Sequence, residues 1–132
     1  MNKLHSLINQ VWSFATQGAV FSSPCIFGNY VFCGSHDKHL YCLEAATGNL
    51  IWKLSFSSVI YASPCYLPIS NQNECLVCSC SSKGEVFLIQ GSSGKVIQCV
   101  NTGGDIFSSP VMIPGYVTVG TRNNELFIGK LE

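Results

Sequence analysis

The sequence predicts an all-β fold, a partial β-propeller of about three four-stranded antiparallel blades. The main observation is an internal repeat, because three Ser-Pro pairs lie 40 and then 46 residues apart, at Ser23, Ser63 and Ser109. An insertion of six residues between Pro64 and Val77 accounts for the longer interval, so the underlying period is 40 residues. A period near 40 that contains several short strands is typical of propeller blades and not of helical solenoids.

Each repeat consists of strands separated by turns. In the first repeat, residues 30–33 and 39–43 are strand-forming runs on either side of the polar residues 34–38, which predicts a hairpin. Gly48 then marks a tight reversal before residues 49–56, because glycine adopts the positive φ that such turns require. With the run that precedes them, these strands predict a four-stranded sheet.

The composition argues against two classes of partner. Only 11% of the 132 residues are charged and the formal net charge is zero, so no electrostatic field favours nucleic acid or an anionic membrane. The apolar runs are of strand length and are interrupted by glycine, proline or serine, which argues against a membrane span of about 20 residues. We therefore expect no nucleic acid and no membrane among its partners.

The N-terminus and the cysteines predict a cytoplasmic protein. Residues 1–10 lack the continuous apolar region and the small-residue cleavage site of a secretion signal. Eight cysteines without such a signal are typical of reduced thiols in the cytosol.

We expect the chain to begin with an orphan outer strand at residues 9–16, because Trp12 aligns with Trp52 one repeat later. The first blade, residues 22–56, follows, and its strands are predicted at residues 22–27, 30–34, 39–44 and 49–56.

The second blade, residues 62–101, repeats this order with strands at residues 62–67, 75–80, 85–90 and 95–101. Its inner hairpin carries the insertion, residues 68–74, which we expect to be a polar loop too long for a tight turn. We favour a tolerated surface insertion over a recognition element; the possible recognition loop comprises Ser70, Asn71, Gln72 and Asn73. Gln98 takes the place of Trp52, so the second docking aromatic is missing.

The third blade, residues 108–131, is predicted to be incomplete, with strands at residues 108–113, 116–121 and 125–130 and no fourth strand. Propellers close with four to eight blades, so we expect exposed apolar surface at both open ends. Missing blades of a longer propeller would cover it. Self-association would also cover it, if residues 11–16 pair with the unfinished third blade within one chain or between chains.

Two groups of metal-ligating residue types are weighed against packing. Cys75, Cys78 and Cys80 lie in one strand, where alternation places Cys75 on the face opposite the other two, and no histidine is close in sequence. We therefore favour packing over a metal site. His36 and His39 flank a turn, and we interpret them as exposed turn residues and not as ligands.

The blade motifs carry a family resemblance. Residues 45–52 place Thr-Gly before Trp, and the Ser-Ser-Pro opening, the Gly-Ser-x-Asp turn at residues 34–37 and Leu-Tyr-x-Leu at residues 40–43 accompany them. This pattern resembles the pyrroloquinoline-quinone-like repeat family over nearly the whole chain, residues 1–132. The resemblance implies that tryptophans pack across to the neighbouring blade and are buried there; the structural docking residues are Trp12, Trp52, Thr47, Gly48 and Gly94.

The cysteine-rich form of the repeat, without a secretion signal, is most similar to the C-terminal repeat domain of the beta-alanine-activating enzyme family, which resembles acyl-CoA synthetases. In that family adenylation and carrier domains lie upstream of the propeller, so the resemblance implies them as partners. It implies a non-catalytic scaffold or recognition module, with no enzymatic activity in this chain. The alternative is a redox or ligand-sensing propeller of the quinoprotein type.

Quinoprotein dehydrogenases of the same fold use a calcium site, a catalytic carboxylate and a disulfide between adjacent cysteines. This chain has no adjacent cysteine pair, and its aspartates are Asp37, in a turn, and Asp105, at a blade junction. Few hard oxygen ligands remain for calcium, and the repeated serines lack the histidine and carboxylate motif of a catalytic triad. We expect no catalytic residue, no metal and no cofactor.

Overall fold

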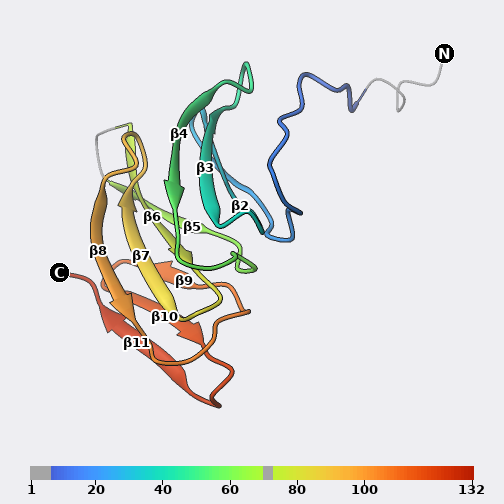
Figure 1. The fold of residues 1–132 in the computed structure, drawn as a ribbon. Helices are drawn as coiled ribbons and strands as arrows, with labels where there is room; N and C mark the ends of the chain where they lie inside the picture. Colours follow the sequence, from blue (N-terminus) through green and yellow to red (C-terminus); the bar gives the residue numbers. More distant parts are fainter. Residues whose placement is uncertain (1–6, 70–72) are drawn as a thin grey trace.

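The computed structural model describes residues 7–69 and 73–132 and contains three antiparallel β-sheets (Figure 1). The fold is all-β, and the sheets are the three predicted blades. Blade 1 consists of β1 (Cys25–Phe27), β2 (Tyr30–Gly34), β3 (His39–Glu44) and β4 (Leu50–Ser55); blade 2 of β5 (Cys65–Ile69), β6 (Glu74–Cys80), β7 (Glu85–Gln90) and β8 (Val96–Asn101); blade 3 of β9 (Val111–Ile113), β10 (Tyr116–Gly120) and β11 (Leu126–Lys130). Within the described ranges, no helix has the length and hydropathy needed to cross a bilayer.

The core lies in two layers between successive blades. The layer between blades 1 and 2 contains Phe32, Leu40, Cys42, Phe56, Ile60, Cys75, Val77 and Ile89. The layer between blades 2 and 3 contains Ala62, Cys78, Cys80, Val86, Ile106, Met112, Val117 and Val119. The predicted separation of the β6 cysteines is confirmed, because Cys75 packs in the first layer whereas Cys78 and Cys80 pack in the second.

The innermost strand begins later than predicted in every blade, at Cys25, Cys65 and Val111. In blades 1 and 2 the serine N–H of the preceding Ser-Pro pair bonds to the next blade and not to the strand beside it in its own sheet. The N–H of Ser23 donates to Ser63 Oγ at 2.7 Å, and the N–H of Ser63 donates to Ser109 Oγ at 2.8 Å. The following prolines have no N–H to contribute to a ladder. These segments therefore join the three blades in series.

Residues 9–16 do not form the predicted orphan strand. They belong to no sheet, because a strand is defined by hydrogen bonds to a neighbouring strand, and none lies beside them in the described part of the chain. The segment instead lies against blade 1. The rings of Phe14 and Tyr41 are 5.5 Å apart between centroids, and the N–H of Gln17 donates to the Asp37 carboxylate at 3.0 Å.

The insertion lengthens a hairpin and does not form the predicted loop over all of residues 68–74. Pro68 pairs with Cys75 and Ile69 with Glu74 in the ladder between β5 and β6, and β5 tolerates the proline because it is an edge strand. Three members of the possible recognition loop, Ser70, Asn71 and Gln72, lie outside the described residues. Asn73 is exposed in the turn that leads into β6.

Candidate functional site

A tryptophan of blade 1 docks on a turn of blade 2. Trp52, in β4, donates its indole N–H to the carbonyl oxygen of Gly91 at 2.8 Å. Gly94 has a φ of 75°, and a Cβ added to it would lie 2.7 Å from Trp52 Cδ2. Glycine is therefore required at position 94 both by the backbone and by the closeness of the indole.

Trp12 repeats this contact one blade earlier. Its indole N–H donates to the carbonyl oxygen of Ala45 at 2.8 Å, and Gly48, with a φ of 77°, lies so close that a Cβ would be 2.5 Å from Trp12 Cδ2. Thr47 shapes the same turn, since its hydroxyl bonds to the Glu44 carboxylate and accepts the N–H of Asn49. Residues 11–16 thus occupy the place of an outer strand against blade 1 without being paired in a sheet.

Trp52 lies at the contact between blades 1 and 2, and Trp12 lies between the N-terminal segment and blade 1. Both were expected to be buried. Trp12 and Trp52 are half-buried, because each indole rests on a turn at the edge of a sheet. The five predicted docking residues form two notches of the same geometry, one on blade 1 and one on blade 2.

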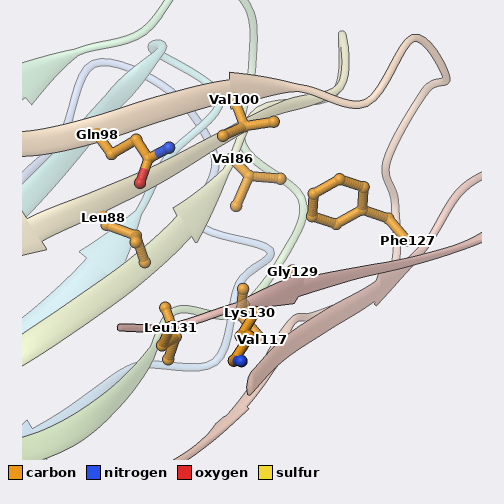
Figure 2. Close-up of a pocket in the computed structure, with 9 residues that line it drawn as sticks. All are labelled: Val86, Leu88, Gln98, Val100, Val117, Phe127, Gly129, Lys130 and Leu131. Carbon is orange, nitrogen blue, oxygen red and sulfur yellow. The ribbon is translucent and has the colours of Figure 1, made fainter. Parts of the chain in front are cut away.

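Between blades 2 and 3, where a third docked indole would be expected, there is a cavity instead (Figure 2). Gln98 stands where Trp52 stands in blade 1, and Gly129 faces Val117 at the position that Leu43 and Ile89 occupy in the other blades. These two smaller or more polar residues leave a space of about 220 Å³ between blades 2 and 3, lined by Val86, Leu88, Gln98, Val100, Val117, Phe127, Gly129, Lys130 and Leu131.

A row of aromatic rings, tilted against one another, runs across all three blades. Phe21, Tyr61 and Phe107, the aromatic row, each stand two residues before the serine of a Ser-Pro pair. The Phe21 and Tyr61 centroids are 6.2 Å apart, and those of Tyr61 and Phe107 are 4.7 Å apart. Sequence reasoning missed this row, although the 40- and 46-residue spacing of its members was a readable signal.

Two turn residues complete the aromatic row. The His36 ring meets Tyr61 edge-on at 4.4 Å and lies 4.6 Å from Phe21, while the Arg122 guanidinium lies 4.9 Å from the Phe107 centroid. His36 Nε2 is buried and has no hydrogen-bond partner. The row offers ring faces and one cation, with Phe21 65% exposed.

His39 and Asp37 serve the turn between β2 and β3. The carboxylate of Asp37 accepts the N–H of His39 at 3.0 Å and the Tyr41 hydroxyl. Burial alone raises the pKa of Asp37, but these bonds and that from the Gln17 N–H hold it below its ordinary value. His39 Nδ1 lies 2.9 Å from the Asp37 carbonyl oxygen. The side chains of this turn therefore fasten the N-terminal segment to blade 1.

The eight cysteines are free, and four of them are buried. Burial raises the pKa of Cys25, Cys42 and Cys75 to about 12, and the contact with Cys78, together with burial, raises that of Cys65. Such thiols are poor nucleophiles near neutral pH. In residues 7–69 and 73–132, no three side chains of histidine, cysteine, aspartate or glutamate converge as a metal site would require.

Blade 3 presents an uncovered apolar face, which we call the blade 3 face and which consists of Val111, Ile113, Tyr116, Thr118, Leu126 and Ile128. These side chains alternate with those that pack against blade 2. By register they match Cys65, Leu67, Leu76, Cys78, Val86 and Leu88 of blade 2, which pack in the core or against it. The exposed face of blade 3 is thus the counterpart of a face that blade 2 buries.

Comparison with known proteins agrees with this geometry. Residues 9–129 match the protein family described as "Outer membrane protein assembly factor BamB". The chain is 31% identical over 128 residues to the "Beta-alanine-activating enzyme" of Danio rerio and 36% identical over 108 residues to that of Homo sapiens. These matches cover 96% and 80% of the chain but only 11% and 10% of the two relatives.

Solved structures show the same fold. The crystal structure of BamB from Moraxella catarrhalis superposes with a TM-score of 0.70 at 14% identity, over 90% of this chain and 36% of that one. The WD40 β-propeller domain of Doa1 superposes with a TM-score of 0.62 at 19% identity, over 76% of this chain and 32% of that one. At these identities the likeness concerns the fold alone, and the chain spans about a third of each structure.

Proposed function

The chain belongs to the family of BamB-like, pyrroloquinoline-quinone-like repeat propellers, and from this premise we propose that it acts as a non-catalytic scaffold or recognition module. It is homologous to about a tenth of the length of beta-alanine-activating enzymes. We propose that it works as part of such an enzyme, next to the adenylation and carrier domains that activate and hold the amino acid.

The observation that carries the non-catalytic role is that the repeated polar side chains are committed to holding the blades together. Ser63 and Ser109 accept backbone N–H groups of the preceding blade, and Ser22 and Ser108 bond to Gly34 and Gly120 of their own blades. The buried thiols have raised pKa values. A serine hydroxyl without an adjacent general base and a thiol with a raised pKa are both poor nucleophiles.

The aromatic row supports a recognition role. Phe21 and Phe107 are exposed, and the Arg122 guanidinium lies beside Phe107; ring faces with one cation suit a partner that has a flat or apolar portion and an acceptor group. A carrier-bound acyl group or a segment of the carrier domain has this chemistry.

The test compares the full-length Danio rerio relative with a version that lacks the segment homologous to this chain. We expect the deletion to retain beta-alanine-dependent exchange of pyrophosphate into ATP, and the isolated chain to catalyse none. Exchange by the isolated chain would overturn the non-catalytic role. Substituting leucine for the aromatic-row equivalents in the full-length enzyme should weaken transfer from the carrier while exchange stays unchanged.

We also propose that the chain is cytoplasmic, which its eight free cysteines support. Fractionation of cells that produce the native chain tests this localisation, and recovery in the secretory compartments would contradict it.

A further inference from the structure

Blade 2 holds two cysteines that lie directly opposite each other in neighbouring strands. Cys65, in β5, is the register partner of Cys78, in β6. Among the paired strands of the described chain, this is the one register pair with a cysteine at both positions. The equivalent pair contains one cysteine in blade 1 and none in blade 3. The cysteine pair is therefore a property of blade 2 and not of the repeat.

The two cysteines have the spacing that a disulfide needs. Residues directly opposite each other in an antiparallel ladder have Cα atoms about 4.5–5.5 Å apart, and a disulfide joins Cα atoms about 4.4–6.8 Å apart. The Cys65 and Cys78 thiols are in hydrogen-bonding contact. Cys80 also contacts Cys78, but residues two apart along one strand are separated by about 6.4–6.8 Å, at the upper limit of that range. Cys65 is therefore the favoured partner of Cys78.

The pair lies inside the molecule and is accessible through one of its members. Blades 1 and 3 flank blade 2, and β5 contacts both β1 and β9. Cys78 is fully buried, whereas Cys65 is half-buried in the edge strand β5. Contact with Cys78 and burial raise the pKa of the Cys65 thiol, which slows its reaction with an oxidant but does not change which sulfur lies beside it.

We propose that Cys65 and Cys78 form a site of reversible oxidation, at which hydrogen peroxide joins β5 to β6 through a disulfide. The Cys65 thiolate attacks one peroxide oxygen, the O–O bond breaks, and the leaving hydroxide is protonated, which gives water and a Cys65 sulfenic acid. The Cys78 sulfur then attacks the Cys65 sulfur, the S–O bond breaks, and a second water leaves. Two thiols thus lose two electrons and two protons, and one peroxide becomes two waters. Two molecules of a reduced thiol such as glutathione reverse the reaction by exchange. The proposal does not depend on the proposed function.

The disulfide would fasten the segment that joins the three blades. Cys65 follows the Ser-Pro pair whose Ser63 accepts the N–H of Ser23 and donates its own N–H to Ser109. A covalent bond at Cys65 restricts the local opening of β5. The amides of β5 should therefore exchange with deuterium more slowly in the oxidised chain than in the reduced chain.

The test treats the reduced 132-residue chain with an equimolar amount of hydrogen peroxide and maps the product. The number of thiols titrated under denaturing conditions should fall from eight to six, and dithiothreitol should restore it. After alkylation of the remaining thiols, cleavage on the carboxyl side of glutamate yields residues 45–74, which contain Cys65 alone, and residues 75–85, which contain Cys78. Mass spectrometry should show these two peptides linked by a disulfide.

Matched substitutions in β6 identify the partner of Cys65. Cys78→Ala should abolish the link, whereas Cys75→Ala, at an equally buried position on the other face of β6, should keep it. Cys80→Ala should keep the link as well. The map of the unaltered chain stands without any variant, so poor folding of Cys78→Ala does not weaken the test. Eight thiols left after peroxide, Cys65 oxidised without a link to residues 75–85, or a link that survives Cys78→Ala would overturn the proposal.

Discussion

At the residue scale, the two tryptophan notches depend on glycines that serve two purposes at once. Gly48 and Gly94 adopt positive φ and leave space for an indole. The sequence pattern of Thr-Gly followed by Trp suggested these docking residues. The aromatic row was missed although its members recur with the spacing of the Ser-Pro pairs, because the pattern does not say that their rings meet across blades.

Gly94→Ala is expected to destabilise the chain more than alanine at another glycine of positive φ. Gly103 has a φ of 81° with nothing within 4 Å of an added Cβ, so Gly103→Ala measures the backbone cost alone, roughly 1–2 kcal/mol. At Gly94 the Cβ also meets Trp52, which adds about 1–3 kcal/mol of overpacking. Urea unfolding of both variants checks this, and equal losses would mean that the indole contact contributes nothing.

The lowered pKa of Asp37 predicts that the free energy of unfolding decreases in acid. Its pKa in the folded chain lies below the ordinary value of 3.8, so its stabilising effect is complete above about pH 4 and is lost as the pH falls through the lower, folded-state pKa. Asp37→Asn should therefore be less stable than the unaltered chain at pH 7, and the difference should shrink below pH 4. Asp105→Asn is the control in urea unfolding at each pH. A difference that stays constant from pH 7 to pH 2 would contradict the prediction.

At the element scale, most strands were predictable because alternation and turn residues are local signals. The bounds of β2, β3 and β7 agree with the prediction at both ends. The errors arose where hydrogen bonds come from elsewhere in the molecule. Residues 9–16 need a neighbouring strand in order to be one, and residues 22–24 give the N–H of Ser23 to blade 2. The local sequence pattern reveals neither the missing neighbour of residues 9–16 nor the bond from Ser23 to blade 2.

The cavity between blades 2 and 3 predicts a stabilising substitution. Gln98 is exposed at the edge of this cavity, and Gln98→Leu replaces its amide with an apolar side chain of similar volume that can pack on Val86 and Leu88, so the free energy of unfolding should rise by about 0.5–1.5 kcal/mol. Gln17→Leu, at an exposed position that does not line this cavity, is the control and should give no such gain. Urea unfolding measures both changes. A loss of stability in Gln98→Leu would indicate that the amide is hydrated and bonded in place.

At the scale of the whole molecule, the shared fold with quinone-type repeat propellers does not by itself carry quinone chemistry. Calorimetric titration of the chain with pyrroloquinoline quinone and calcium is expected to give no saturable heat. Micromolar binding would overturn the scaffold proposal in favour of a redox or ligand-sensing propeller.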